Sequence, residues 1–216
     1  MSSVFVYAIS YDLGFAPNPF GGMCSLACCK PRIREQARLG DWVVGMTGTR
    51  LKPAMRCIFA MEVTGEATFD EYWNNTDFAS RRPVRNGSQK KLVGDNIYHR
   101  ASPQSPWEQE DSVHSLEDGS QSDLNTRHDT RINRVLLSTN FFYLGSLAEP
   151  LPQRVIKELS YKRNPRDYFR FDTGRSPDLV RWLEAKVAAN PNAVLADPIN
   201  FSLSARRFDP ERARMV

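Results

Sequence analysis

The stretch CSLACCKPRIREQARLGDWVVGMTGTRLKPAMRCIFAMEV, residues 24–63, decides the expected fold. Pro31 and Gly40 bracket a short helix, because proline suits a first helical turn and glycine supplies a left-handed stop. Residues 42–46 and 58–63 are apolar without alternation, which predicts two strands buried on both faces. A helix, a Gly-Asp break and two core strands therefore form the expected nucleus of the chain.

The composition is that of an ordinary soluble domain. A length of 216 residues with 41% hydrophobic content favours one domain, or one domain with an appendage. No apolar run approaches the roughly 20 residues that span a bilayer. The start, MSSVFVYAISYD, has no basic region and no cleavage site and predicts a first strand. We therefore expect an unprocessed cytoplasmic protein without a membrane partner.

The charge distribution is compatible with a nucleic-acid partner and does not require one. The formal net charge is +4 and the isoelectric point is about 8.9. The basic residues form three groups: Lys30, Arg32, Arg34 and Arg38; Arg81, Arg82, Arg85, Lys90 and Lys91; and Arg206, Arg207, Arg212 and Arg214.

The four cysteines do not have the spacing of a metal site. Cys24, Cys28 and Cys29 lack the C-x2-C pattern, and Cys57 has no neighbouring cysteine. We expect no metal and read the cysteines as reduced thiols, one of which would be reactive if the neighbouring cations stabilise its thiolate. The sequence also lacks a P-loop, a dinucleotide fingerprint and a G-x-S-x-G motif, so no cofactor is expected.

Polar side chains gather in two later segments. Asp95, Asn96, Tyr98 and His99 stand together beside a glycine, in a density of polar groups that no core requires. Residues 100–131 then show almost no hydrophobic periodicity and include His114 and His128. A loop of about thirty residues within a domain is uncommon and is usually functional or disordered.

The last quarter of the chain predicts helices. Residues 176–189 give the clearest helix, with Ser176 as N-cap, Pro177 in the first turn and an apolar face that includes Leu183. A shorter helix is expected at 152–159.

Two families share features with these segments. A helix, Gly40-Asp41, the strand from Trp42 and the strand at 58–63 resemble the centre of PUA-like domains of the EVE and ASCH type. Those are small β-barrels that bind RNA or read a flipped modified base. The resemblance implies an α+β fold with a mixed, partly closed PUA-like β-barrel, peripheral helices and a helical C-terminal extension.

A longer resemblance is to the nucleotide-modification-associated domain family, second type, of bacteria and phages. It rests on residues 14–17 (GFAP), 26–34 (LACCKPRIR), 40–42 (GDW), 94–99 (GDNIYH) and 135–138 (VLLS). It implies a nucleotide-modification-associated, PUA-like domain over residues 1–150, with residues 151–216 as the helical extension packed on it. It also implies a link to bacterial or phage systems that make or handle modified nucleobases.

Candidate site residues follow from side-chain chemistry. Asp and Asn bond base edges, aromatic rings and His stack on bases, and cations hold phosphates. The expected nucleotide-binding residues are Phe15, Lys30, Arg34, Asp41, Asn96, Tyr98, His99 and His114. If the protein is an enzyme, His99 with Asp95 is the expected acid–base pair, with His114 as the alternative partner of His99.

The sequence leaves three functions open. The first is recognition of a nucleotide or a modified base in nucleic acid, within a DNA-modification or restriction system. The second is an enzyme that modifies or hydrolyses a nucleotide or base through His99 and Asp95. The third is an interaction module that binds a protein partner in a modification complex.

Overall fold

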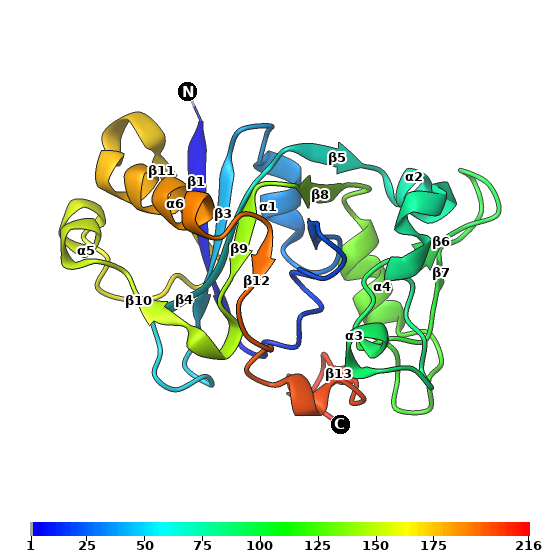
Figure 1. Ribbon diagram of the computed structural model, residues 1–216. Helices are drawn as coiled ribbons and strands as arrows, with labels where there is room; N and C mark the ends of the chain where they lie inside the picture. Colours follow the sequence, from blue (N-terminus) through cyan, green and yellow to red (C-terminus); the bar gives the residue numbers. More distant parts are fainter. Residues whose placement is uncertain (1) are drawn as a thin grey trace.

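The computed structural model describes residues 2–216 and is built around one mixed sheet (Figure 1). Its strands run in the order β11 (Tyr168–Asp172), β1 (Ser3–Ile9), β3 (Trp42–Thr47), β4 (Arg56–Glu62), β9 (Phe141–Tyr143) and β12 (Ala193–Val194), and β10 (Glu149–Pro150) also pairs with β4. The pairs β1–β3 and β9–β12 are parallel, and the other pairs are antiparallel. The first strand and the two core strands expected from the sequence are confirmed as neighbours in this sheet.

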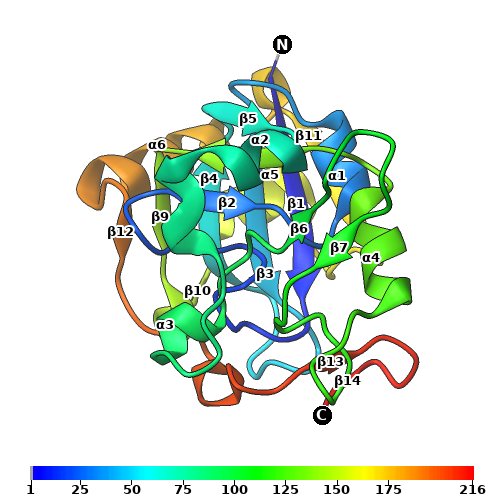
Figure 2. The same cartoon turned by 90° about the vertical axis from the view of Figure 1, so that its right-hand side faces the viewer.

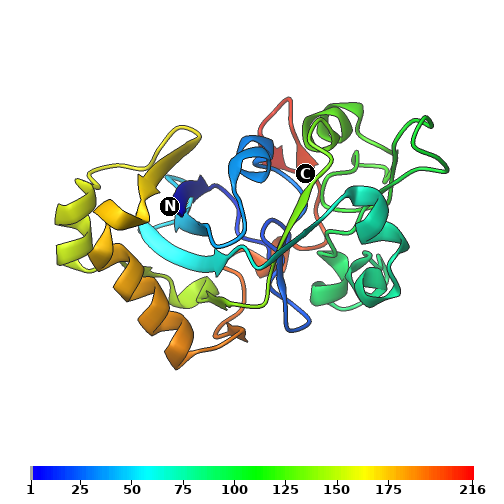
Figure 3. The same ribbon diagram turned by 90° about the horizontal axis from the view of Figure 1, so that it is seen from above.

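Both faces of the central strands are covered. Val4 and Val6 of β1 pack into the core formed with helices α5 (Gln153–Leu159) and α6 (Pro177–Ala189), whereas Phe5 and Tyr7 pack into the core on the opposite face. Viewed from above, α5 and α6 lie on one side of the sheet and the remaining helices on the other (Figure 3). This double coverage explains why β3 and β4 are apolar without alternation.

The expected α+β class and the peripheral helices are confirmed, but the barrel is not. Within residues 2–216 no sheet closes on itself, and the central sheet has open edges at β11 and β12. Strands in a closed barrel and strands covered on both faces have the same apolar pattern. Helices on one side and a second layer on the other produce that pattern in this fold.

The second layer is a small antiparallel sheet that leads into a separate lobe. It contains β2 (Cys24–Leu26), β8 (Val135–Ser138) and β5 (Gly65–Ala67), with the helix α1 (Pro31–Gln36) following β2. The lobe in front in Figure 2 contains α2 (Phe69–Asn74), η1 (Thr76–Arg81), α3 (Gln89–Leu92), β6 (Tyr98–His99), β7 (Glu108–Gln109) and α4 (Asp123–Thr130). The segment 100–131, expected to be a long loop, therefore includes one short strand and one helix.

The C-terminal segment contributes strands as well as helices. Besides α5 and α6, residues 151–216 supply β11 and β12 to the central sheet. They also contain η3 (Thr173–Arg175), η4 (Phe201–Leu203) and the hairpin β13 (Phe208–Asp209) and β14 (Arg214–Met215), and η2 (Gly145–Leu147) precedes them. No helix in the described part of the chain has the length and apolar composition to cross a membrane.

Helix α6 forms where the sequence predicts it, but it is capped differently. Ser176 occupies the N-cap position without a side-chain hydrogen bond. Instead, the Glu158 carboxylate at the end of α5 accepts the backbone N–H groups of Asp178 and Leu179 at 2.8 and 3.0 Å. A cap from a neighbouring helix satisfies the first amides of α6 and holds the two helices together.

Gly45 in β3 gives a test of how closely the central sheet packs. A Cβ at this position would lie 2.2 Å from Phe59 Cε1 and 2.7 Å from Ile9 Cδ1, both in the core. We predict that Gly45→Ala lowers the free energy of unfolding by about 2 kcal/mol, the usual cost of overpacking a core. Urea unfolding followed by circular dichroism measures this change.

The matched control is Gly65→Ala in β5. A Cβ there would make only an ordinary contact, 3.7 Å from Leu137 Cβ. Equal stability losses in the two variants would contradict the close packing described for Gly45.

Candidate functional site

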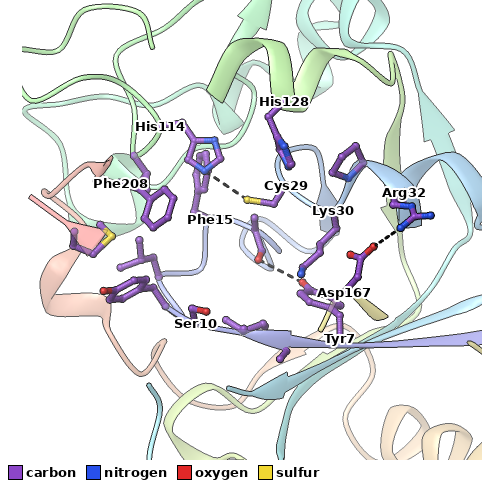
Figure 4. Close-up of a pocket in the computed structure, with 18 of the residues that line it drawn as sticks. Tyr7, Ser10, Phe15, Cys29, Lys30, Arg32, His114, His128, Asp167 and Phe208 are labelled. Carbon is purple, nitrogen blue, oxygen red and sulfur yellow. Dashed lines mark hydrogen bonds and ion pairs between the residues drawn. The ribbon is translucent and has the colours of Figure 1, made fainter. Parts of the chain in front are cut away.

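A cavity of about 480 Å³ opens beside the end of β1. Six parts of the chain line it: the end of β1 with the loop that follows, the turn before α1 with the start of that helix, the loop that carries His114, the end of α4, the residue before β11, and the hairpin β13–β14 (Figure 4). Its size lies within the range of about 300–1,000 Å³ that is usual for small-molecule sites. The cavity therefore has room for a ligand of nucleotide size.

The turn between β2 and α1 directs Cys29 into this cavity. Cys29 and Lys30 both have left-handed backbone conformations, with φ values of 61° and 40°, and Pro31 begins α1 immediately afterwards. Such conformations are costly for residues other than glycine and concentrate at functional sites. A nucleophile on a strained strand-to-helix turn is also the arrangement of the nucleophile elbow in α/β-hydrolases.

Cys29, His114 and Asp129 form a hydrogen-bonded series. Cys29 Sγ lies 3.5 Å from His114 Nε2, and His114 Nδ1 lies 2.8 Å from Asp129 Oδ2 (Figure 4 shows the first of these contacts). Cys29 and His114 line the cavity, whereas Asp129 is fully buried behind His114. A thiol, an imidazole and a carboxylate in this order form the triad of cysteine-dependent acyl transferases and hydrolases.

Asp129 is held by two further donors. Its Oδ1 accepts the backbone N–H of Cys29 at 2.7 Å, and its Oδ2 accepts the Tyr98 hydroxyl at 2.9 Å. Burial, together with the Asp129 charge, raises the pKa of Tyr98 well above its ordinary value, so the phenol remains a donor. These contacts fix the carboxylate in the orientation that His114 requires.

The local charges keep His114 protonated. Burial alone would lower its pKa, but the Cys29 sulfur and the Asp129 carboxylate outweigh burial and raise the pKa of His114 to about 10. Burial would raise the pKa of Asp129, but His114 and then Arg34 hold it below its ordinary value. An imidazolium between a carboxylate and a sulfur is the charge arrangement that stabilises a thiolate.

The other cysteines differ from Cys29 in burial. Cys24, Cys28 and Cys57 are fully buried, and burial raises the pKa of each thiol well above its ordinary value. Only Cys29 among the four reaches the cavity and contacts a histidine.

A metal site is a poorer interpretation of the same residues. Ligand atoms of Cys28, His114 and Asp129 lie within 4.8 Å of one another. However, the Cys28 thiol is fully buried and donates to the backbone carbonyl of Asp95 at 3.7 Å. His114 and Asp129 also direct their facing atoms at each other. The donor set therefore favours a proton-transfer series.

Arg34 holds together the backbone segments that carry this series. Its guanidinium is fully buried and donates to the backbone carbonyls of four residues: Cys29 at 3.0 Å, Asp129 at 2.6 Å, Ile132 at 2.7 Å and Arg134 at 2.6 Å. One side chain thus connects the turn that carries Cys29 to the end of α4 that carries Asp129.

The predicted nucleotide-binding residues separate into those at the cavity and those behind it. Phe15, Lys30 and His114 line the cavity. Tyr98 lies behind His114 through its bond to Asp129, and Arg34 is buried. Their role in binding stays a prediction.

Asp41, Asp95 and Asn96 do not line the cavity and are hydrogen-bonded to other parts of the protein. Asp41 accepts the N–H of Ser3 at 2.6 Å and that of Arg38 at 2.8 Å. Asp95 is fully buried, accepts the Tyr72 hydroxyl at 2.9 Å and the Ser25 hydroxyl, and lies 3.5 Å from Arg81 Nε. Asn96 donates to the carbonyls of Tyr72 and Phe78.

His99 belongs to a different group from Asp95. Its ring stacks on Trp73 with centroids 4.1 Å apart, and its Nε2 lies 3.1 Å from Glu110 Oε1. Neither His99 nor Asp95 lines the cavity. The structure therefore does not bring together the two residues proposed from the sequence as an acid–base pair.

Sequence reasoning did not single out Cys29 or Asp129 as a functional pair. The available signal was the order Cys-Cys-Lys-Pro at the start of a basic helix, which marks a cysteine on a turn next to cations. Asp129 is one hundred residues away, in a segment without periodicity, and only the fold brings it to Cys29.

Fold and site together define an α+β protein with a Cys–His–Asp series at the wall of a ligand-sized cavity. The chain belongs to the nucleotide modification associated domain 2 family, whose model matches residues 1–205. It is therefore associated with nucleotide modification. No curated protein matches the sequence, and no solved structure matches the fold.

Arg34→Lys tests whether Arg34 is a structural support. Lysine keeps the charge but cannot reach four carbonyls with a planar fork, so we predict a loss of about 3 kcal/mol in the free energy of unfolding. Urea unfolding provides the measurement. Arg32→Lys, at an exposed position on the same helix, should change stability by less than about 0.5 kcal/mol. An unchanged stability in Arg34→Lys would show that these bonds are not needed.

The raised pKa of His114 predicts a pH-dependent stability. The folded protein holds this proton more tightly than the unfolded chain, so the contribution is complete below about pH 6.5 and is lost as the pH rises toward about 10. We predict that His114→Gln costs about 3 kcal/mol at pH 6 and clearly less at pH 9.5, as measured by urea unfolding. A cost independent of pH would contradict a protonated His114.

Proposed function

We propose that this protein is a cysteine-dependent enzyme of nucleotide modification, with Cys29 as the nucleophile. His114 exchanges the proton, and Asp129 keeps the imidazole oriented and protonated. The observation that carries this proposal is the series from Cys29 Sγ through His114 to Asp129, which ends at a cavity of ligand size. The family supplies the nucleotide-modification setting.

The reaction class that these groups support is acyl transfer or hydrolysis at an amide or ester of a nucleotide. In the reacting state the Cys29 proton already lies on His114 Nε2, and the sulfur adds to the carbonyl carbon. His114 returns this proton to the departing amine or alcohol, which leaves a thioester on Cys29. A water or another acceptor then loses a proton to His114 and takes the acyl group, which releases the Cys29 sulfur beside a protonated His114.

This proposal moves the acid–base role away from Asp95 and His99. Asp95 is fully buried against Arg81 and does not line the cavity. His99 contacts Glu110 and Trp73 in the lobe. His114, the alternative partner considered from the sequence, contacts a thiol and a carboxylate at once.

Recognition of a nucleotide or modified base without chemistry is the second candidate. Aromatic residues such as Phe15 and Phe208 line the same cavity as Lys30 and Arg131, and such a lining can bind a nucleotide with no contribution from the thiol. The two candidates differ in what Cys29 does. A reader needs the shape of the cavity, whereas an enzyme needs a nucleophilic sulfur.

Reactivity of Cys29 is the direct test. We predict that iodoacetamide at pH 7 alkylates Cys29 at least tenfold faster than Cys24, Cys28 or Cys57, because only Cys29 is accessible and paired with an imidazolium. Peptide mass spectrometry at timed intervals gives all four rates within one protein sample. His114→Gln should slow the reaction at Cys29 about tenfold or more.

His128→Asn provides the matched control, because His128 lines the cavity but forms no hydrogen bond to the sulfur. This variant should keep the reaction rate of Cys29. Equal rates for wild type and His114→Gln would contradict an activated thiol. Recognition of a nucleotide or modified base without chemistry would then be the better-supported function. Turnover itself is measured as a mass change in acylated nucleotides, present with wild type and absent with Cys29→Ser.

A further inference from the structure

The cavity has a cationic side. Lys30, Arg32 and Arg131 line it together with a single carboxylate, that of Asp167. Three cations and one carboxylate leave two positive charges on the wall beside the Cys29–His114 pair. Partial burial lowers the pKa of His128, so this neighbouring ring adds no charge near neutral pH.

Two of these cations are uncompensated. Arg32 pairs with Asp167 at 3.3 Å, in a contact that is largely exposed. Among residues 2–216, no carboxylate lies within 4.0 Å of the Lys30 ammonium or the Arg131 guanidinium. Lys30 instead lies over the Tyr7 ring, with Nζ 5.0 Å from its centroid. Unpaired cations at the wall of a cavity favour an anionic ligand.

Arg34 connects the two segments that carry these cations. Lys30 and Arg32 belong to the start of α1, and Arg34 on the same helix donates to the carbonyl of Ile132, the residue that follows Arg131. This bond holds the end of α4 against α1. In Figure 4, Lys30 and Arg32 lie to one side of Cys29.

The opposite side of the cavity is aromatic and apolar. Phe15 and Phe208 lie there, next to His114 and across Cys29 from Lys30 and Arg32 (Figure 4). The Phe15 ring meets His114 edge-on with centroids 4.8 Å apart, and Phe208 packs edge-on against Tyr11 at 6.2 Å. Aromatic walls of this kind accept a planar ring by stacking or by edge contacts.

This inference rests on the proposed function. We infer that the substrate is a nucleoside phosphate that binds across Cys29. Its phosphate lies at Lys30, Arg32 and Arg131, and its base lies against Phe15 and Phe208. A phosphate monoester carries close to two negative charges at neutral pH, which matches the two positive charges of the wall, whereas a carboxylate carries one. Arginine offers a bidentate fork and lysine a point charge, the two usual ways of holding phosphate.

This arrangement also explains the position of the thiol. With the phosphate at one side and the base at the other, the atoms between them lie nearest to Cys29 Sγ. A substrate held at both ends presents the reacting group to the sulfur at low entropic cost.

The experiment measures binding in the Cys29→Ser protein, so that it does not depend on thiol chemistry. Isothermal titration calorimetry is run with the common deoxynucleoside and ribonucleoside 5′-monophosphates, the matching nucleosides, inorganic phosphate and acetate. We expect at least one monophosphate to bind at least tenfold more tightly than its nucleoside, and acetate not to bind. Added Lys30→Gln and Arg131→Gln substitutions should remove this advantage and leave nucleoside binding unchanged.

Two further variants test whether binding depends on the residues that line the cavity. Arg127→Gln removes an exposed arginine of α4 that does not line the cavity, and it should bind the monophosphate as the parent does. Phe208→Ala should weaken nucleoside and monophosphate alike and leave inorganic phosphate unaffected.

The outcomes separate this inference from the proposed function. Equal affinity for monophosphate and nucleoside, equal loss in Arg127→Gln, or no binding of any monophosphate at millimolar concentration would overturn the phosphate site, even where Cys29 alkylates as an activated thiol. Cation-dependent binding with an unreactive Cys29 would keep the phosphate site and remove the enzyme. A single-stranded oligonucleotide that binds more tightly than its mononucleotide would identify a phosphodiester as the source of the phosphate.

Discussion

One buried guanidinium, that of Arg34, holds the site together. Its bonds to four backbone carbonyls join segments that are about one hundred residues apart in the chain. Without these bonds, the turn with Cys29 and the end of α4 would meet with their carbonyl groups facing each other inside the protein. The charge of Arg34 also lies close to Asp129 and helps to keep that carboxylate ionised. A residue that resembles a phosphate ligand in the sequence thus acts on the backbone.

Asp129 performs two tasks because its two oxygens have different partners. Oδ2 faces His114 and Tyr98, and Oδ1 accepts the amide of Cys29. The carboxylate therefore fixes both the imidazole and the backbone of the residue that carries the sulfur. It also follows that the Cys29 amide is already engaged, so stabilisation of a developing oxyanion must come from other donors at the cavity.

Local patterns were sufficient to predict the central elements. The apolar runs without alternation predicted β3 and β4, and the apolar face of residues 176–189 predicted α6. Whether the sheet closes into a barrel could not be predicted, because strands in a barrel and strands covered on both faces have the same apolar sequence pattern. The resemblance to the nucleotide-modification-associated domain family was correct, whereas the barrel implied by the PUA-like resemblance was not confirmed.

The site itself was less accessible to sequence reasoning. Phe15, Lys30 and His114 were selected for their chemistry and do line the cavity. The polar residues from Asp95 to His99 were predicted to form a binding site, because buried polar networks and binding sites use the same residue types. In the fold, Asp95 satisfies Arg81 and Asn96 satisfies backbone carbonyls. The role of Asp129 could not be predicted from the residues around it, because that role depends on a contact with a residue one hundred positions away.

The hairpin β13–β14 and the loop of His114 share their supports. Phe208 donates its N–H to the carbonyl of Val113 at 2.6 Å, and Arg207 binds the Asp111 carboxylate with two nitrogens. The Asn125 amide bridges the carbonyls of His114 and Phe208 at 2.7 and 3.4 Å. A displacement of Phe208 would therefore also strain the backbone that carries His114. The backbones of the apolar wall and of the His114 loop therefore belong to one hydrogen-bonded unit, so that neither is expected to shift without the other.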